Sequence, residues 1–491
     1  MVKGSEQSPS SRAAQVLFAI ARDALAACDP ARAVARAARP AEGQMTVCGR
    51  TLHLQKRGRL LVVAFGKAAG AMAAGLAESM KQAGSRREIR GLLVVPKDAS
   101  PGKQAPGKAA AGGGAKPPLG LTRIVAGHPL PDKASFRAGG QALRLLARAG
   151  AGDDVIFLAS GGGSALLAAP LEPFIAAPEK IALHRLLLTS GAPISTVNAV
   201  RKHLSALKGG RLAVAARRAK SQTTLVLCDV DPERYDEVAS GPSMPDRGTL
   251  DDFVEAIDRY GIAPALPGRV LDALRAGRLP ETPKPRAAVF RRSKWESLLS
   301  NRDLRNGAVR AGLSRGLSAE AVLTEVTGGV EESVEAVARA IESAPPGIRL
   351  LILGGEVLTA PGRPGLGGRA QEFALRLALR MARLGSRPWS FLALQSDGVD
   401  GNSPAAGAFV DGTTLERARI AGLDPQKSLR EAQSYRLFSA LGDALVTGPT
   451  GTNVRDLYLL LTGAQSTPPA GRPPVKRAAP GRPPSRPGSG S

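Results

Sequence analysis

The sequence predicts an α/β protein made of two doubly wound domains. Short apolar runs of strand length alternate with helical patterns along the 491 residues, which is typical of parallel strands joined by helices. The alternation restarts after a Pro- and Arg-rich stretch at 279–286. A chain of this length exceeds one ordinary core, and its 43% hydrophobic residues suffice to fill two.

The expected elements fall into two sets. The first set has strands at 60–65, 91–95, 123–126, 155–159 and 224–229, with helices at 68–83, 135–149 and 179–190. The second has strands at 295–299, 321–324, 349–353 and 391–394, with helices at 331–343 and 371–384. An amphipathic helix over 11–28 precedes both, with its apolar side chains inward: Val16, Leu17, Ile20, Ala24 and Leu25.

We expect an N-terminal domain over 11–278 and a C-terminal domain over 288–462. Two segments carry too few apolar residues to join either core: an insert at 98–120, rich in Gly, Pro, Ala and Lys, and a basic, Pro-rich tail at 463–491. Both should be removable at little cost in stability.

The charge balance restricts the class of partner. Lys and Arg number 67 and Asp and Glu 42, which leaves a net charge of +25. Because this excess is spread along the chain and aromatics reach only 3%, few rings are available to stack on bases. We therefore expect no nucleic-acid partner, and a basic cleft for phosphates and carboxylates instead.

Cysteine usage and hydropathy point to the cytoplasm. Cys28, Cys48 and Cys228 lie far apart without a CxxC pair, which excludes a disulfide framework or a zinc site and fits a reducing compartment. The longest apolar runs have strand length, so no membrane span is expected.

In doubly wound folds ligands bind at the carboxyl ends of strands, so we expect the functional residues in the turns after strands. The first such turn is Phe65-Gly66-Lys67-Ala68. It places an ammonium group beside the free N–H groups at the start of a helix, a natural anion site. The glycine spacing is not that of a Walker A loop, and a surface lysine at a helix start is the simpler alternative.

A glycine nest follows the strand at 155–159, with the sequence Ser160-Gly161-Gly162-Gly163-Ser164. Consecutive glycines let the backbone approach a ligand closely and point its N–H groups toward it. The hydroxyls of Ser160 and Ser164 would add donors. A plain tight turn is the alternative, but it seldom requires three glycines, so we interpret the nest as a phosphate or carboxylate site.

Two carboxylates are candidates for holding a cation, since the scattered histidines and cysteines offer no other ligands. Asp229 follows the strand at 224–227, and Asp397 lies in the Gly-rich turn after 391–394. Carboxylate oxygens at strand ends can bind Mg²⁺. A helix cap or an Asx turn would have the same sequence, and both alternatives stay open.

The C-terminal set supplies a cationic candidate. Gly355 and Glu356, which we expect to contribute to phosphate or substrate binding, follow the strand at 349–353. Arg369 opens a helix after the glycines at 365–368. A guanidinium group there suits the stabilisation of charge on a phosphoryl group, although an arginine on the surface would look the same. The match of 365–370 to GxGxxG/A is no dinucleotide fingerprint, because a strand does not lead directly into it.

Taken in order, these segments resemble the glycerate 2-kinase family, whose C-terminal part is the MOFRL domain and some of whose members are labelled hydroxypyruvate reductase. Order and spacing agree from about Gln15 to Leu461. The matching stretches are 62–68, 127–132, 160–167, 198–205, 208–213, 239–243, 354–356, 367–369, 371–375, 397–401 and 447–454.

The resemblance implies two Rossmann-like domains with the active site in the cleft between them. It also implies ATP as donor, a divalent cation such as Mg²⁺, and D-glycerate as acceptor, giving 2-phosphoglycerate. It carries the catalytic lysine onto Lys67 and the arginine onto Arg369. Several C-terminal positions depart from the family pattern, among them Ala370, Pro404 and Gln433. A non-catalytic or altered-substrate relative is therefore kept as an alternative and a reductase as a third reading. The oligomeric state is left open, with a homodimer as one option.

Overall fold

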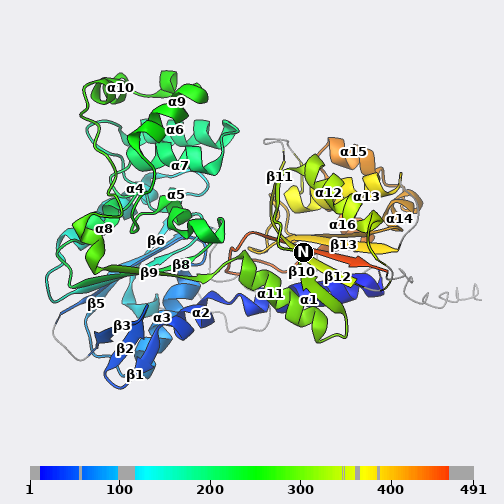
Figure 1. Cartoon of the computed structure of the whole chain (residues 1–491), viewed down its shortest axis with the longest axis horizontal. Helices are drawn as coiled ribbons and strands as arrows, with labels where there is room; N and C mark the ends of the chain where they lie inside the picture. Colours follow the sequence, from blue (N-terminus) through cyan, green and yellow to red (C-terminus); the bar gives the residue numbers. More distant parts are fainter. Residues whose placement is uncertain are drawn as a thin grey trace, which may run out of the picture.

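The computed structural model of the chain describes residues 11–54, 58–97, 117–345, 347, 349–359, 365–383 and 388–463. Two central sheets lie side by side in this part of the chain, each covered by helices (Figure 1). The α/β class expected from the sequence is confirmed. Most of the insert expected at 98–120, and the tail after Gly463, lie outside the described residues.

The first sheet is parallel throughout. Its strands run in the order β6 (Thr122–Ala126), β5 (Ile89–Pro96), β4 (Leu60–Phe65), β7 (Asp154–Ala159), β8 (Ser221–Leu227) and β9 (Ser293–Leu299). In chain order this is the Rossmann arrangement 3-2-1-4-5-6, which reverses its winding between β4 and β7. Ligands in such sheets bind at this switch point.

The connections of the first sheet follow the expected pattern. They include α3 (Ala69–Gln82), α4 (Lys133–Ala147), α5 (Gly163–Leu166) and α8 (Arg211–Ala215). Every residue of β4, β7 and β8 is buried. Continuous apolar runs form such strands because helices cover both faces of a parallel sheet.

The second sheet is mixed. Its order is β10 (Ser318–Ala321), β12 (Arg349–Leu358), β16 (Asp456–Thr462), β13 (Trp389–Gln395), β14 (Gly407–Asp411) and β15 (Ala444–Leu445), while β11 (Val326–Gly329) also pairs with β12. β16 lies between β12 and β13 and is antiparallel to both. The helices packed around this sheet are α11 (Asn301–Leu313), α12 (Val330–Glu342), α13 (Arg369–Met381), α14 (Thr414–Ile420), α15 (Pro425–Arg430) and α16 (Ser434–Leu441).

Three expectations about strands were wrong or incomplete. The strand at 295–299 belongs to the first sheet as β9, because an apolar run indicates a strand but not the sheet that it joins. The segment 321–324 is mostly the connection between β10 and β11 rather than a strand. The central strand β16 was not expected at all, and its apolar run lies just after the motif at 447–454.

A helical unit stands above the first sheet (Figure 1). It comprises α6 (Ala177–Thr189), α7 (Ile194–His203), α9 (Leu250–Arg259) and α10 (Gly268–Arg275), which share an apolar core of their own. Smaller elements complete the fold: the antiparallel sheet β1 (Arg39–Ala41), β2 (Gln44–Val47) and β3 (Arg50–His53), and the 3₁₀ turns η1 (Pro118–Gly120), η2 (Pro232–Ser240), η3 (Ala263–Ala265) and η4 (Ala288–Arg292).

The N-terminal helix joins the two halves. α1 (Arg12–Ala27) is capped by Ser11 and buries the face that its amphipathic pattern predicts. It packs beneath the second sheet, where Phe18 meets Phe409 with ring centroids 6.4 Å apart. α2 (Pro30–Ala37) then leads to the first sheet (Figure 1). One cluster of buried apolar side chains includes residues of α1 and of both sheets.

In the part of the chain that the structure describes, no helix has both the length and the apolar character that a membrane span requires.

Candidate active site

The turns after β4 and β7 interlock at the switch point of the first sheet. The Lys67 N–H donates to the Gly161 carbonyl at 2.9 Å, and the Ala68 N–H donates to Ser160 Oγ at 3.1 Å. Gly66 has φ +119°, and a Cβ there would collide with Ser160. The expected lysine turn and the expected nest are therefore one structure, and the Ser160 hydroxyl holds that structure together.

The nest is crowded by functional groups, which explains its glycines. A Cβ on Gly161 would overlap the Asp229 carboxylate, and one on Gly162 (φ +80°) would lie 3.0 Å from the His128 ring. Within the described residues, the N–H groups of Gly161 and Gly162 have no hydrogen-bond partner. Two free donors thus lie next to Lys67 and Asp229, as a phosphate site requires.

Carboxylates gather where β16 begins. Its first residue, Asp456, is in register with Gly355 of β12 and with Gln395 of β13. Glu356 and Asp397 follow these two partners closely in the sequence. The antiparallel insertion of β16 between two strands therefore places three carboxylates along one edge of the second sheet.

Arg369, the first residue of α13, is bound by two of these carboxylates. Its Nε and Nη2 donate to the two oxygens of Asp456, each at 2.9 Å, and its Nη1 donates to Glu356. This planar, bidentate geometry fixes the direction of the guanidinium group. About a quarter of the side chain (26%) stays exposed and accessible to a ligand.

Asp400 fixes the start of α13 itself. Its carboxylate accepts hydrogen bonds from the N–H groups of Ala370 at 3.1 Å and Gln371 at 2.8 Å, and from the side-chain amide of Gln395 at 2.7 Å. A carboxylate at this position satisfies the unpaired donors of the first helical turn and favours the helix dipole. Asp400 therefore positions Arg369 without contacting the cleft.

The two halves of the site meet in an ion pair. Lys67 Nζ lies 2.7 Å from Asp397 Oδ2, and the two side chains are 30% and 15% exposed. Asn453, from the loop before β16, lies against Gly161 of the nest. The carboxyl end of the first sheet therefore faces the carboxylate edge of the second, and the candidate active site lies between them.

Burial and like charge shift the acids of this site. Burial, together with the charge of Glu356, raises the pKa of Asp229 to about 6, although Lys67 opposes the shift. Burial also raises the pKa of Asp456, to about 7, against the pull of Arg369. Burial works against the charge of Arg369, but Asp456 and Glu356 outweigh it and raise its pKa. Strongly shifted groups at a strand-end crevice mark a functional site.

The donor set fits Mg²⁺ held partly by substrate. Among the described residues no group of three His, Cys, Asp or Glu side chains could close around a metal ion. Asp229 and Asp397 both lie beside Lys67. Mg²⁺ is commonly bound through one or two carboxylates, with waters and phosphate oxygens completing its shell.

The remaining expectations fare differently. Gly355 has φ +144° and packs against the backbone of Val326 in β11, so its missing side chain serves the sheet. Ser164 Oγ lies 2.8 Å from Ser240 Oγ. Sequence reasoning missed Asp456 as the partner of Arg369, because the signal, a strand reversed between two others, appears only in the fold. It also missed Asp400 as the residue that fixes the start of α13.

Comparisons with known proteins agree with this geometry. Residues 16–275 match a domain described only as a domain of unknown function, DUF4147, and residues 349–456 match the MOFRL family. The chain is 34% identical to the D-glycerate 2-kinase of Thermotoga maritima, over 82% of this chain and 90% of that one. It is 36% identical to an Agrobacterium vitis protein provisionally named hydroxypyruvate reductase, over 92% and 95% of the two chains. The crystal structure of a Thermotoga maritima glycerate kinase superposes with a TM-score of 0.72 at 31% identity, over 92% and 99%.

Proposed function

The chain belongs to the glycerate kinase family, and from this premise we propose that it transfers the γ-phosphoryl group of ATP to D-glycerate, forming 2-phosphoglycerate. The observation that carries the proposal is the 2.7 Å contact between Lys67 and Asp397. It brings a lysine beside an anion-binding nest into the same site as an arginine held by carboxylates. A kinase requires such positive charge and positioning rather than covalent chemistry.

We assign the roles by position. The N–H groups of Gly161 and Gly162 bind phosphate oxygens, and Lys67 and Arg369 stabilise the charge on the transferring group from opposite sides. Asp229 and Asp397 would hold Mg²⁺, which when bound shields the phosphate charge. Asp456, Glu356 and Asp400 keep Arg369 aimed at the cleft. Preorganised charge of this kind is usually the largest contribution to catalysis.

The reductase alternative lacks its binding loop. In a Rossmann sheet the dinucleotide fingerprint follows the first strand. In this chain that strand is β4, and the turn after it reads Phe65-Gly66-Lys67-Ala68 with a single glycine. A lysine that faces an acid across the cleft provides positive charge for a transferring phosphoryl group. It is less suited to the pyrophosphate of a dinucleotide, which a Rossmann loop binds through its backbone alone.

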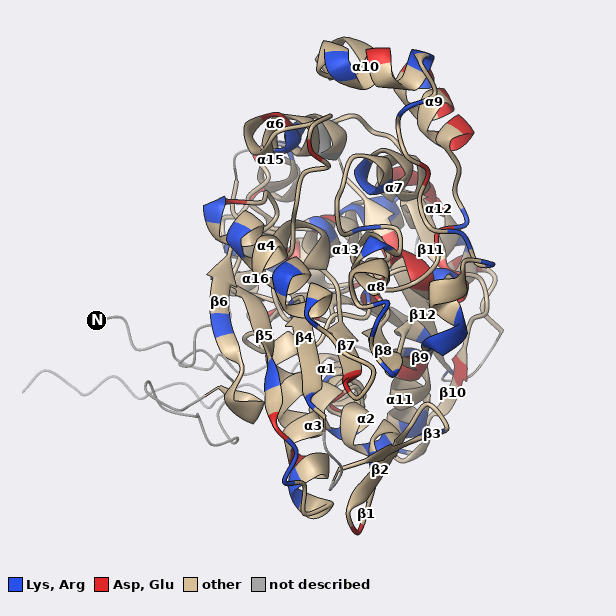
Figure 2. Ribbon diagram, turned by 90° about the vertical axis from the view of Figure 1, so that its left-hand side faces the viewer, with Lys and Arg blue, Asp and Glu red and all other residues tan. Residues whose placement is uncertain are grey.

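We further propose that the partners are small molecules and that the enzyme is cytoplasmic. Figure 2 shows Lys and Arg distributed over many elements rather than gathered into one stripe, which argues against a nucleic-acid track. Cys28, Cys48 and Cys228 are free thiols, in keeping with a reducing compartment.

One assay tests the proposed reaction. The purified full-length chain is incubated with D-glycerate and Mg-ATP, and the products are resolved by phosphorus NMR. We expect 2-phosphoglycerate and ADP. Formation of 3-phosphoglycerate would correct the regiochemistry. Absence of any phosphoglycerate, with NADH-dependent reduction of hydroxypyruvate instead, would overturn the kinase proposal.

A further inference from the structure

Four basic side chains lie buried together where the helical unit meets the first sheet. They are Lys180 and His184 of α6, Arg201 of α7 and Lys208 in the following loop, and they are 2%, 2%, 8% and 0% exposed. We call them the cation cluster. Lysine and arginine are almost never this buried unless they are paired.

The cation cluster has few partners. Lys180 Nζ donates to the Leu204 carbonyl at 2.7 Å, and Lys208 Nζ donates to the Ala239 carbonyl at 3.4 Å. Arg201 Nε and His184 Nε2 are buried and have no hydrogen-bond partner among the described residues. Among the described residues no acid contributes to the electrostatics of Lys180, Arg201 or Lys208. Burial of cations without a counter-charge is unfavourable.

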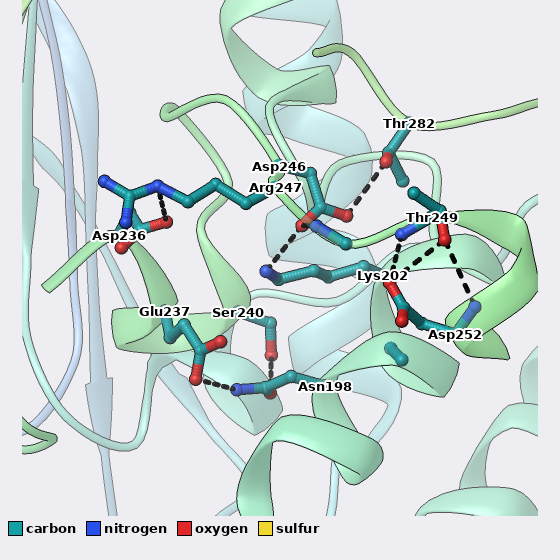
Figure 3. A network of polar contacts seen from close by, with 12 residues as sticks. Asn198, Lys202, Asp236, Glu237, Ser240, Asp246, Arg247, Thr249, Asp252 and Thr282 are labelled. Carbon is teal, nitrogen blue, oxygen red and sulfur yellow. Dashed lines mark hydrogen bonds and ion pairs between the residues drawn. The ribbon is translucent and has the colours of Figure 1, made fainter. Parts of the chain in front are cut away.

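The neighbours of Arg201 show how this fold otherwise treats buried cations. Lys202 Nζ lies 2.8 Å from Asp246, and His203 Nε2 lies 2.8 Å from Glu281. Figure 3 shows Lys202 extended toward Asp246, which Thr282 also contacts. Three consecutive residues of α7 are therefore basic and buried, and Arg201 is the one of them to which the described chain supplies no acid.

The pKa values shift as expected for an incomplete site. Burial lowers the pKa of Arg201 to about 10. Burial, followed by the charges of Arg201 and Arg211, lowers the pKa of Lys180 to about 7. Burial, followed by the charges of Arg201, Lys180 and Lys208, lowers the pKa of His184 to about 2. A bound anion would oppose each of these shifts.

The cation cluster borders the nest. Lys208 bonds the carbonyl of Ala239, and the side chain of Ala239 lies against Gly163. The Ser240 hydroxyl lies 2.8 Å from Ser164 Oγ. It also donates to Asn198 Oδ1 at 2.9 Å (Figure 3). Asn198 precedes Arg201 by one turn of α7, so both belong to one helix face. A row of hydroxyl and amide groups thus connects the nest to Arg201.

This connecting segment is held in a costly conformation. Ala239 and Ser240 have φ values of +54° and +62°, in the left-handed region that residues with a Cβ avoid. Backbone strain of this kind persists where the surroundings enforce it, and it clusters at ligand sites. Two strained residues thus hold a hydroxyl and a carbonyl between the nest and the cation cluster.

We propose that the cation cluster binds the carboxylate of the hydroxy-acid acceptor, through Arg201 and Lys208, while Ser164, Ser240 and Asn198 contact its hydroxyl groups. The inference rests on the proposed glycerate kinase reaction. A carboxylate fits better than a phosphate, because Gly162 faces Lys67 whereas Gly163 faces Ala239. The phosphate groups and the cation cluster therefore lie on different sides of the nest.

The test compares two neighbouring cations in the full chain. Arg201→Met should raise KM for D-glycerate about thirtyfold or more and change KM for ATP less than about threefold. Its melting temperature without ligands should stay equal or rise, since an unpaired buried charge is removed. The matched control, Lys202→Met, leaves Asp246 unpaired; it should lower the melting temperature and leave both KM values near normal.

A second variant covers the case in which Arg201→Met folds poorly: Lys208→Met should also raise KM for D-glycerate and leave KM for ATP unchanged. If the wild type phosphorylates D-glycerate but neither variant changes its KM, the inference is wrong and the proposed function stands. A rise in KM for ATP instead would show that the cluster binds phosphate, which also overturns it. A wild type without glycerate kinase activity would overturn the proposed function and this inference with it.

Discussion

Arg369 and Arg201 lie near the carboxyl ends of the two sheets, and they are treated in opposite ways. Arg369 is gripped by Asp456 and Glu356, while Asp400 secures the helix that carries it. Arg201 is more deeply buried, yet within the described part of the chain its Nε has no hydrogen-bond partner and no acid lies beside it. The paired arginine has its direction set before substrate arrives, whereas the unpaired one depends on a ligand to complete its surroundings.

This difference indicates that the two arginines have different roles in the proposed reaction. A group that stabilises charge during phosphoryl transfer must be in place in advance, because reorganisation during the reaction raises the barrier. A group that binds the substrate in its ground state can instead receive its counter-charge from the substrate. Because such a group is already desolvated, it favours an anion. Mutations on the two sides should therefore affect kcat and KM differently.

The largest effect is expected at the site shared by both sheets. Lys67→Ala or Arg369→Ala should lower kcat by about a hundredfold or more and change KM less, because each acts mainly in the transition state. The double variant should lose less than the product of the single losses, because the two side chains act on one group. Arg369→Lys should not rescue, since a point charge replaces the planar fork.

Steady-state kinetics with D-glycerate and Mg-ATP measure these losses, and circular dichroism checks the folding of each variant. A folded Lys67→Ala protein with near-normal kcat would show that the site is misassigned.

The next effect concerns the grip on Arg369. Asp456→Asn removes the negative charge that faces Arg369 and leaves the volume of the side chain nearly unchanged. We expect kcat to fall about tenfold, because Arg369 loses its fixed direction. The matched control is Asp443→Asn, which breaks the ion pair with Arg417 at 2.8 Å elsewhere in the same half. Both variants should melt at lower temperature, but only Asp456→Asn should lose kcat. Equal kcat values would mean that the pairing of Asp456 with Arg369 supports the fold and not catalysis.

The raised pKa of Asp229 predicts that the wild type loses stability as the pH rises. Its native pKa of about 6 exceeds the ordinary 3.8, so the native state binds the extra proton between about pH 4 and 6. The Asp229 carboxyl contributes fully to the stability of the wild type below pH 4. This contribution is lost as the pH rises through 6. The loss amounts to at most about 3 kcal/mol.

Asp229→Asn should therefore melt a few degrees above the wild type at pH 8 and close to it at pH 4, measured by calorimetry without Mg²⁺ or nucleotide. The same variant should be nearly inactive. A constant difference in melting temperature across this range would contradict the assigned shift.

The smallest effect is expected at Ser160. Its hydroxyl accepts from Ala68 N–H and so supports the lysine turn; Ser160→Ala should lower kcat/KM about fivefold through Lys67, since one lost hydrogen bond is worth about 1 kcal/mol. Ser79→Ala is the control, because Ser79 Oγ is buried in α3 and no described residue forms a hydrogen bond with it. If Ser160→Ala behaves like Ser79→Ala, the interlocked turns do not depend on this bond.

The local parts of the site could be predicted from the sequence. Strand β4 has the expected bounds, Arg369 opens its helix as expected, and the nest follows β7 directly. Each follows from short-range signals: apolar runs, glycines and helix starts. The pairing of these parts could not be predicted, because Asp456 meets Arg369 only once β16 inserts between β12 and β13.

The cation cluster was missed for a related reason. Lys180, Arg201 and Lys208 are separated in sequence, and in isolation each reads as a solvated surface cation. Their burial depends on how the helical unit packs on the first sheet, which no local pattern encodes.

The position of α1 has a consequence for how the chain is made. This helix is synthesised first, but Phe409, which its Phe18 contacts, leaves the ribosome near the end. At about 5–20 residues per second the apolar face of α1 waits on the order of tens of seconds for its partner. Until then the nascent chain carries an exposed amphipathic helix that a chaperone can bind. The apolar core shared by α1 and both sheets can form only after the C-terminal half has left the ribosome.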